Sequence, residues 1–346
     1  MKALRVVRVH STMLAAAIAL VALPGVVPQA AAANNKANKG AAARPAPEAL
    51  IAAIESAQGL PVLASGAKGP AVIRAQVLLD REWYSPGEID GRFANNMQHA
   101  VRSFQAFRGL KVSGVVDGAT WEALQAGGAP PLVRYVVNEA DLRGPFAPIP
   151  RDIMERAKLQ RLGYTSPVEG LAEKFHVSPR LLEDLNRGRQ LAVGSELIVP
   201  NVVDTKPTRK AASILVLKNQ KRLLVLDDKE VPLASFPISM GGRNDPLPLG
   251  TMNIKNEVDN PSFTYDPKLI WDAKPHHAKV EIAPGPNNPV GSIWLGLSKP
   301  HWGIHGTPEP GLVGRTETHG CIHVTNWDAR RLSTVVASGF AVNVRE

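Results

Sequence analysis

The chain has 346 residues, of which 44% are hydrophobic and 21% are charged. This ordinary globular composition excludes a generally disordered chain, and at roughly 150 residues per domain the length favours two or three domains. The net charge of +9 suits an anionic polymer, but it does not distinguish nucleic acid, a membrane surface and cell-wall glycan. The single cysteine excludes an internal disulfide, because a bridge needs two cysteines.

Residues 1–33 have the pattern of a signal peptide. Lys2 and Arg5 precede an apolar run from Met13 to Leu23, and alanines follow at 31–33. The run is shorter than the roughly 20 residues that span a bilayer, which disfavours a retained membrane span. No cysteine lies near the cleavage site, which excludes a lipid-modified N-terminus. We therefore predict an exported protein, located in the periplasm or cell-wall space.

The segment 34–58 is predicted to be a flexible tether. From Asn34 to Pro47 it consists mainly of alanine, asparagine, lysine and proline, with no large apolar residue. Such a composition cannot bury enough apolar surface to offset the entropy of folding. No secondary structure is expected before the first domain.

Residues 59–128 are predicted to fold as a compact three-helix domain. Apolar residues recur three or four positions apart in 72–79 and 100–110, as on one face of an amphipathic helix, and a third helix begins at Ala119. Asp-Gly pairs between the helices mark tight turns. A single small core should hold the three helices.

The same segment resembles the family of helical peptidoglycan-binding domains. That family has a Gly-x-Ile-Asp-Gly-x-Phe turn before an Ala-Val-x-x-Phe-Gln helix, and these motifs stand here at Gly87–Phe93 and Ala100–Gln105. Asp90 and Arg92 are the exposed polar candidates for contact with a ligand. The alternative is that every matching residue serves the core or a turn, which gives the fold without affinity.

Residues 133–202 form a second predicted module, with the order strand, helix, helix, strand. The elements are expected at 135–137, 168–175, 179–185 and 197–200. This order resembles a LysM glycan-binding repeat. About thirty residues separate the first strand from the first helix, where that family has only a few, so the module is expected to be an interrupted copy. His176 is interpreted as a packing or surface residue and not as a ligand-binding residue.

Residues 210–346 are predicted to form a mostly-β domain. The apolar runs 214–217 and 223–226 flank a short polar turn and predict a hairpin. Further strands are expected at 236–238, 251–254 and 291–297, and a closing helix is expected from Asn326 to Ala337. The whole chain is thus expected to be a multidomain α+β protein with a three-helix domain, a βααβ module and a mostly-β domain.

The clearest chemical signal lies in two segments near the C-terminus, Gly303–Thr307 and Thr318–His323. The thiolate is the attacking form of cysteine, so a catalytic Cys321 needs a base or a positive field nearby, which His305 or His319 could supply. Gly320 allows a backbone or substrate to approach closely, and the amide of Cys321 could hold an oxyanion. These are the ingredients of a cysteine acyltransferase.

Three alternatives remain for this cluster. Imidazole and thiolate together make a zinc ligand set, which His301, His305, His319, Cys321 and His323 could supply. We nevertheless predict no metal and no cofactor. The sequence has no Cys-x-x-Cys pair, and the His-x-x-x-His spacing of His301 and His305 lies in a stretch that glycine breaks. Histidines packed in a β core would explain any one of these residues but not the cluster. Serine or carboxylate chemistry lacks a Gly-x-Ser-x-Gly elbow.

The cluster closely resembles the catalytic domain of L,D-transpeptidases, the YkuD family, whose signature is a histidine, a loop and then Ser/Thr-His-Gly-Cys. Here His305 precedes Thr318-His319-Gly320-Cys321. Upstream, Leu247–Ile254 and Gly285–Gly291 resemble a strand of that family and its approach to the site, and Asn326–Ala329 resembles the start of its last helix. The resemblance spans about 135 residues of the chain.

The resemblance implies a role for each site residue. These are the nucleophile Cys321, the base His305, the Gly306 carbonyl that orients its imidazole, the pocket residues His319 and Gly320, and the substrate contacts Thr318, His323 and Trp302. Two positions depart from the family pattern: His323 stands where many members have arginine, and Met252 replaces an aromatic residue. Nucleophile and base are unaffected by either departure.

The resemblance further implies that Cys321 attacks a peptidoglycan tetrapeptide stem between meso-diaminopimelate and the terminal D-Ala, and releases D-Ala. The acyl group then passes to an amine of a second stem, giving a 3-3 cross-link, to an outer-membrane lipoprotein or to a D-amino acid. Water as acceptor would make the protein an L,D-carboxypeptidase. The expected partners are stem peptides and glycan, with lipoprotein as a covalent acceptor and no nucleic acid. The competing interpretation is a non-catalytic wall-binding scaffold, which the intact Cys321 and His305 disfavour.

Overall fold

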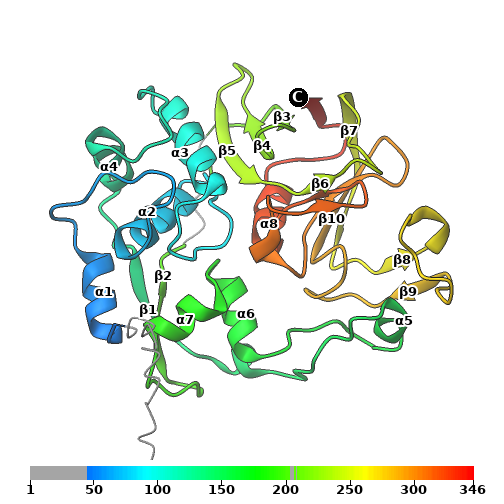
Figure 1. Cartoon of the computed structure of the whole chain (residues 1–346), viewed down its shortest axis with the longest axis horizontal. Helices are drawn as coiled ribbons and strands as arrows, with labels where there is room; N and C mark the ends of the chain where they lie inside the picture. The colour runs from blue at the N-terminus through cyan, green and yellow to red at the C-terminus, as the bar shows by residue number, and fades with distance from the viewer. Residues whose placement is uncertain (1–44, 203–205, 208) are drawn as a thin grey trace, which may run out of the picture. The chain divides into compact units, whose positions relative to one another are not determined.

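The computed structural model describes residues 45–202, 206–207 and 209–346. The predicted signal peptide and the first part of the predicted tether lie outside the described residues. Within the described part of the chain, no helix is both long enough and apolar enough to cross a bilayer. Figure 1 shows helices in the N-terminal part of the chain and a large sheet in the C-terminal part, which confirms the predicted multidomain α+β class.

The predicted three-helix domain is confirmed. Its helices are α2 (Pro70–Arg81), α3 (Asn95–Phe107) and α4 (Gly118–Gln125). They enclose a core that includes Leu78, Phe104 and Trp121, each of which is almost fully buried. Asp117 caps α4, because its carboxylate accepts a hydrogen bond from the amide of Thr120 at 2.9 Å.

An additional helix, α1 (Pro47–Glu55), lies inside the segment 34–58 that the sequence predicts to be a flexible tether. The prediction is wrong for this part of the segment. Leu50 and Ile54, one helical turn apart, are buried in the core that α1 shares with the middle module. The Arg74 guanidinium donates to two carbonyls of the last turn at 3.0 and 3.1 Å, which satisfies the helix end. Two apolar residues suffice to hold this helix in place, because residues from distant parts of the chain form the surface against which they pack.

The middle module has the predicted order of elements. They are β1 (Leu132–Val136), α6 (Pro167–Lys174), α7 (Pro179–Leu185) and β2 (Glu196–Pro200), with β1 and β2 paired antiparallel. Asn186 joins the helices to the sheet, because its side chain accepts from the amide of Ile198 at 2.7 Å and donates to the carbonyl of Ile198 at 2.8 Å. The order is confirmed, and the LysM identity stays a prediction.

The insertion between β1 and α6 packs against the last domain. It contains η1 (Glu139–Leu142) and α5 (Ile153–Arg156), and it contacts the hairpin of β8 (Phe263–Tyr265) and β9 (Val280–Ile282). Leu162 of the insertion is fully buried with Tyr265 and Ile282, and its amide donates to the carbonyl of Pro284 at 3.0 Å. The extra residues that interrupt the LysM-like pattern therefore pack along the β8–β9 hairpin of the last domain.

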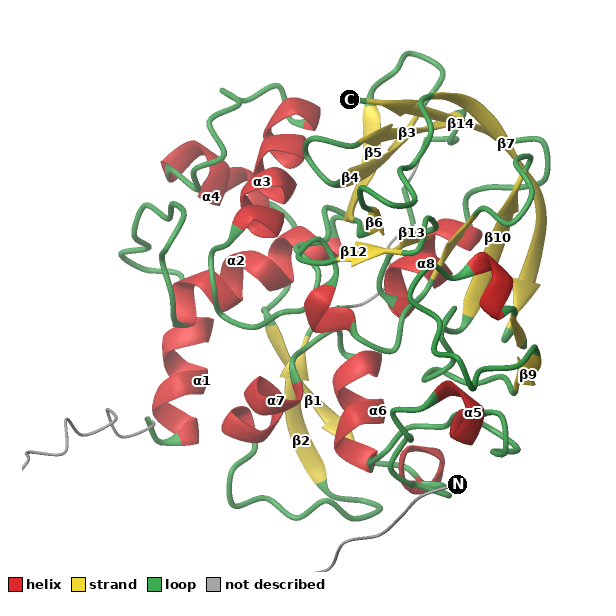
Figure 2. Ribbon diagram, turned by 45° about the vertical axis from the view of Figure 1, so that its right-hand side comes forward, coloured by secondary structure: helices red, strands yellow, loops and turns green. Residues whose placement is uncertain are grey.

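The last domain is built on an eight-stranded sheet with the order β13-β11-β10-β7-β14-β3-β4-β5 (Figure 2). The strands are β3 (Ser213–Leu217), β4 (Arg222–Leu226), β5 (Pro232–Pro237), β7 (Gly250–Asp259), β10 (Ile293–Leu297), β11 (Gly303–His305), β13 (Ile322–His323) and β14 (Ala341–Arg345). The predicted β3–β4 hairpin is confirmed. A short parallel pair, β6 (Met240–Gly241) with β12 (Glu317–Thr318), and the 3-10 helices η2 (Pro267–Leu269) and η3 (Pro310–Leu312) complete the domain.

Helix α8 (Asn326–Ser333) packs against β10 and β11 (Figure 1). The predicted helix to Ala337 is too long by one turn. The residues after Ser333 are β-branched and favour helix less, and the hydroxyl of Thr334 donates back to the carbonyl of Arg331 at 2.8 Å. The chain then turns at Gly339, where φ is +89°, and enters β14.

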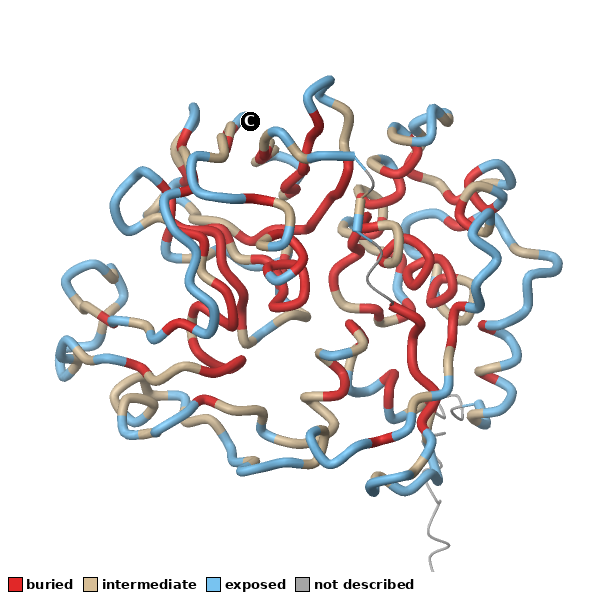
Figure 3. The backbone as a smooth tube through the Cα atoms, turned by 180° about the vertical axis from the view of Figure 1, so that it is seen from behind, coloured by how far each residue is buried: buried red, intermediate tan, exposed pale blue. Residues whose placement is uncertain are grey.

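One buried carboxylate connects the helical domain, the middle module and the last domain. Asp80 of α2 has no exposed side-chain surface, and its Oδ1 lies 2.9 Å from His176 Nδ1 and 2.9 Å from Arg331 Nη2. Burial alone would raise the pKa of Asp80, but Arg331 and His176 outweigh it and lower the pKa to about 2. His176 also stacks on Trp327, with ring centroids 5.1 Å apart, so it is a packing residue as predicted. Figure 3 shows that buried residues concentrate in the strands of the large sheet and in α2.

Candidate active site

The predicted base lies on β11, and the predicted nucleophile directly precedes β13, the edge strand that pairs with β11. β11 and β13 are parallel, with Ile304 opposite Ile322 and His305 opposite His323. Cys321 directly precedes β13, so the pairing places it beside β11. The segments that carry His305 and Cys321 are thus held together by the backbone hydrogen bonds between β11 and β13.

Cys321 is half-buried, and its Sγ lies 3.4 Å from the carbonyl oxygen of His301, to which the thiol donates. Burial raises the pKa of the thiol to about 11, although hydrogen bonds from the backbone at Gly303 and at Cys321 itself act in the opposite direction. The sulfur is therefore protonated at neutral pH. A nucleophilic role requires a base that removes this proton.

His305 has the geometry of such a base. Its ring is buried, stacks on Trp294 with centroids 5.3 Å apart, and places Nδ1 2.7 Å from the carbonyl oxygen of Gly306. A carbonyl only accepts, so Nδ1 carries the proton and Nε2 keeps its lone pair. Burial lowers the pKa of His305 to about 4, which leaves the imidazole neutral at pH 7.

Asn326, whose sequence context predicts only a helix start, packs against Gly306 next to the candidate base. Its Oδ1 accepts from the amide of Ser292 at 3.0 Å, and its Nδ2 donates to both carboxylate oxygens of Glu173 at 3.1 and 3.0 Å. A side-chain carbon on Gly306 would collide with Asn326 Oδ1. Gly306 is thus required for the close approach, and Glu173 of α6 is linked through Asn326 to the residue whose carbonyl accepts from the candidate base.

Gly320 and Thr318 shape the turn that presents the thiol. Gly320 has φ +114°, a conformation that other residues rarely adopt, and a side chain there would contact the Trp302 ring at 3.4 Å. The hydroxyl of Thr318 donates to the carbonyl of Cys321 at 2.7 Å. The predicted substrate contact Thr318 is therefore engaged within the turn, whereas Trp302 lies beside it.

His319 and His323 face different neighbours. His319 is 43% exposed, with Nε2 2.8 Å from Asp272 Oδ1 in the loop between β8 and β9. The ring of His323 lies 4.3 Å from the ring of His305, centroid to centroid. Burial lowers the pKa of His323, and charges on His305 and His319 would lower it further. A second neutral imidazole thus packs against the candidate base.

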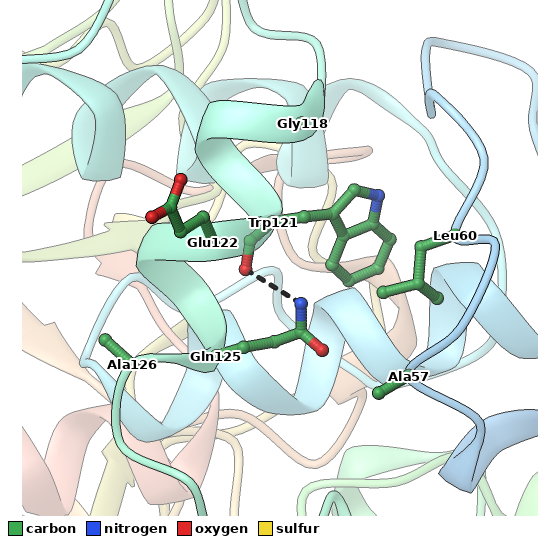
Figure 4. A pocket seen from close by; sticks show the side chains of 7 residues that line it. All are labelled: Ala57, Leu60, Gly118, Trp121, Glu122, Gln125 and Ala126. Carbon is green, nitrogen blue, oxygen red and sulfur yellow. Dashed lines mark hydrogen bonds between the residues drawn. The ribbon is translucent and has the colours of Figure 1, made fainter.

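Neither cavity described in the protein contains the thiol. One of about 480 Å³ lies in the helical domain, where Leu60, Trp121 and Gln125 line it and the Gln125 amide donates to the carbonyl of Trp121 (Figure 4). Another of about 240 Å³ lies between Arg156 of the insertion and Glu309 of the loop after His305. The second cavity adjoins the segment that carries the base.

The alternative zinc set around Cys321 does not appear as a cluster of ligand atoms. Within the described residues, the group that could share a metal ion is Asp152, His276 and His277. No sequence motif links Asp152 to the adjacent His276 and His277, because more than a hundred residues separate the two segments.

Comparison with known families assigns the last domain. Residues 211–344 match the model of the YkuD family, described as the L,D-transpeptidase catalytic domain. The last domain is an L,D-transpeptidase catalytic domain of this family. Residues 68–124 match the putative peptidoglycan binding domain family. Both resemblances predicted from the sequence are confirmed.

Two curated proteins and one solved structure illustrate what this chain is similar to. A putative L,D-transpeptidase YkuD from Bacillus licheniformis is 29% identical over 182 residues, which is 51% of this chain and 92% of the relative. The probable L,D-transpeptidase ErfK/SrfK of Escherichia coli is 28% identical over 183 residues, 51% of this chain and 56% of the relative. A solved L,D-transpeptidase structure from Xylanimonas cellulosilytica is 16% identical, covers 84% of this chain and 99% of its own, and has a TM-score of 0.36.

Proposed function

We propose that this L,D-transpeptidase is exported and forms an acyl-enzyme on Cys321 with peptidoglycan tetrapeptide stems, releasing D-Ala. The observation that supports the proposal is the pairing of β11 with β13, because Cys321 directly precedes β13 and His305, whose Nδ1 lies 2.7 Å from the Gly306 carbonyl oxygen, ends β11. The peptidoglycan-binding domain supports the same substrate and an extracytoplasmic location. The signal-peptide pattern of residues 1–33 provides the route of export.

The chemistry follows from the two protonation states. The thiol and the imidazole are both neutral at pH 7, so His305 Nε2 accepts the thiol proton as Sγ attacks the stem carbonyl. In this proposal the amide of Cys321 holds the resulting oxyanion. The carbon–nitrogen bond to D-Ala then breaks, and the imidazolium returns the proton to the leaving amine. An acceptor amine attacks the thioester, transfers its proton to His305, and the thiol is restored.

The acceptor decides which product forms. A second stem gives a 3-3 cross-link, a lipoprotein amine gives an anchored protein, and water gives carboxypeptidase activity. We propose the second stem, because the helical domain carries a family match to peptidoglycan binding on the same chain. A scaffold without activity is disfavoured by the intact thiol and imidazole pair.

Incubation with defined tetrapeptide muropeptides tests this function. Mass analysis of the products should find free D-Ala together with a dimer that contains one stem-to-stem bond. Tripeptide without dimer would support the carboxypeptidase alternative. Unchanged substrate, with protein bound to sacculi, would support the scaffold and contradict the proposal.

The rate of D-Ala release should depend on pH in a manner set by His305. Burial lowers the pKa of His305 to about 4, so the base stays unprotonated above that pH and is lost as the pH falls through it. We expect kcat/KM to be flat from about pH 5 to about pH 9 and to fall roughly tenfold per pH unit below about 4. Stopped assays in matched ionic strength, with circular dichroism to verify folding, measure the profile. A rate that already falls below pH 6.5 would contradict a neutral buried base.

A further inference from the structure

We propose that Asp152, His276 and His277 form a binding site for one divalent transition metal ion of the zinc type. Asp152 caps α5 in the insertion of the middle module, and the two histidines lie in the loop before β9 of the catalytic domain. Two imidazoles and a carboxylate are a ligand set that zinc accepts. The inference does not depend on the proposed function, because it concerns a separate group of side chains.

The distances fit a single ion. Asp152 Oδ2 lies 3.2 Å from His276 Nε2 and 3.8 Å from His277 Nε2, and all three ligand atoms lie within 4.8 Å of one another. Ligands about 2.0–2.1 Å from zinc in a tetrahedron stand roughly 3.3–3.4 Å apart, so only small side-chain movements are needed. The side chain of His276 is 60% exposed, which leaves a fourth position for water.

His277 provides an independent observation. Its side chain is 9% exposed, and its Nε2 is buried and makes no hydrogen bond, although it faces Asp152. A buried nitrogen without a partner costs free energy, which a ligated ion would recover. The hydroxyl of Tyr265 lies 2.6 Å from Nδ1 of the same ring. The backbone amide of Lys274 also donates to this Nδ1 at 3.3 Å, so a metal on Nε2 requires the ring proton to move to Nδ1. Nδ1 would then donate to the Tyr265 hydroxyl, an outer contact typical of metal-bound histidine.

The surroundings of Asp152 allow a metal ion to compete with Lys274 for the carboxylate. The backbone amide of Met154 donates to Asp152 Oδ1 at 2.8 Å, which leaves Oδ2 facing the two imidazoles. Lys274 Nζ stands 3.7 Å from Asp152 Oδ2, but the lysine side chain is 61% exposed and can move into solvent. If no ion binds, the same residues form an ordinary cluster of ion pairs. A metal site and an ion-pair cluster are distinguished by measuring the affinity of the protein for the metal.

A bound ion would join the insertion to the β8–β9 hairpin. That hairpin carries Asp272, which contacts His319 two residues before Cys321. It also carries Trp271, whose ring centroid lies 5.6 Å from that of His319. The ion would therefore fix the loop that flanks the thiol, in addition to stabilising the fold.

The test uses tag-free protein treated with a chelator, titrated with Zn²⁺ by isothermal calorimetry and then with Co²⁺ by visible absorption. We expect one site, a higher midpoint of thermal unfolding with Zn²⁺, and a Co²⁺ spectrum without the intense thiolate band. Asp152→Asn keeps the helix cap, and His276→Gln changes an exposed side chain. Each should weaken Zn²⁺ binding at least about tenfold.

Two controls separate this site from others. Asp266→Asn removes a carboxylate from the same hairpin, where it pairs with Lys279 at 3.4 Å, and should leave Zn²⁺ binding unchanged. Cys321→Ala removes the thiol and should also leave it unchanged. Equal binding by Asp152→Asn and the unsubstituted protein would overturn the proposal, as would loss of binding in Cys321→Ala or no stoichiometric binding at all.

Discussion

Cys321→Ala is expected to reduce D-Ala release from tetrapeptide muropeptides on the order of 10³-fold or more, because no other group can form the acyl-enzyme. Cys321 is the only cysteine of the chain, and it lies beside β11 on the edge of the sheet. Binding to isolated sacculi should not change, since the helical domain is untouched. Release is measured by coupled detection of D-Ala, and binding by cosedimentation.

Matched variants locate the base. His305→Gln should lower kcat to a similar extent, because its ring is buried beside the Gly306 carbonyl and no other imidazole has that contact among the described residues. His319→Gln should have a smaller effect, since its Nε2 contacts Asp272 and the ring is 43% exposed. Retained D-Ala release in Cys321→Ala, or a larger loss in His319→Gln than in His305→Gln, would contradict the assigned roles.

Asp80→Asn is expected to lower the free energy of unfolding by about 3–5 kcal/mol, which is the usual cost of removing one partner from a buried ion pair. The Arg331 side chain is 3% exposed, and Asp80 Oδ1 contacts both it and His176. Asparagine keeps the shape of the side chain but leaves the guanidinium without this anion. Urea unfolding followed by fluorescence and circular dichroism measures the loss.

The same experiment shows whether the modules unfold together. Asp80 belongs to the helical domain, His176 to the middle module and Arg331 to the catalytic domain, so we expect one cooperative transition in the unsubstituted protein. Asp259→Asn is the matched control, because its pair with Arg330 at 3.4 Å is exposed and should contribute at most about 1 kcal/mol. Equal losses in the two variants would mean that the buried contact does not join the modules.

The candidate nucleophile and base could be proposed from the sequence because their signal is local. Thr318-His319-Gly320-Cys321 is a continuous segment, and the turn it forms depends on Gly320 and on the Thr318 hydroxyl. The alternating apolar runs of β3 and β4, and the helical spacing of α2 and α3, are likewise readable within a short window.

Features that depend on distant contacts were not predictable. α1 was assigned to a tether because its two buried residues gain their free energy from partners elsewhere in the chain. Asn326 reads as a helix start, and only the fold reveals that it contacts Glu173 and Gly306. Asp152 and His276 are more than a hundred residues apart, so no motif links them. His319 was a candidate base by proximity in sequence, but its ring contacts Asp272.

The most direct test of a cysteine acyl-enzyme is the mass of the peptide that contains Cys321 after brief reaction with a tetrapeptide stem and acid quenching. This peptide should gain the mass of the tripeptide acyl group, in step with one equivalent of free D-Ala. The adduct should disappear when an acceptor amine or a second stem is added. Release of D-Ala with Cys321 unmodified at every time point, or an acyl group on any other residue, would contradict a cysteine acyl-enzyme.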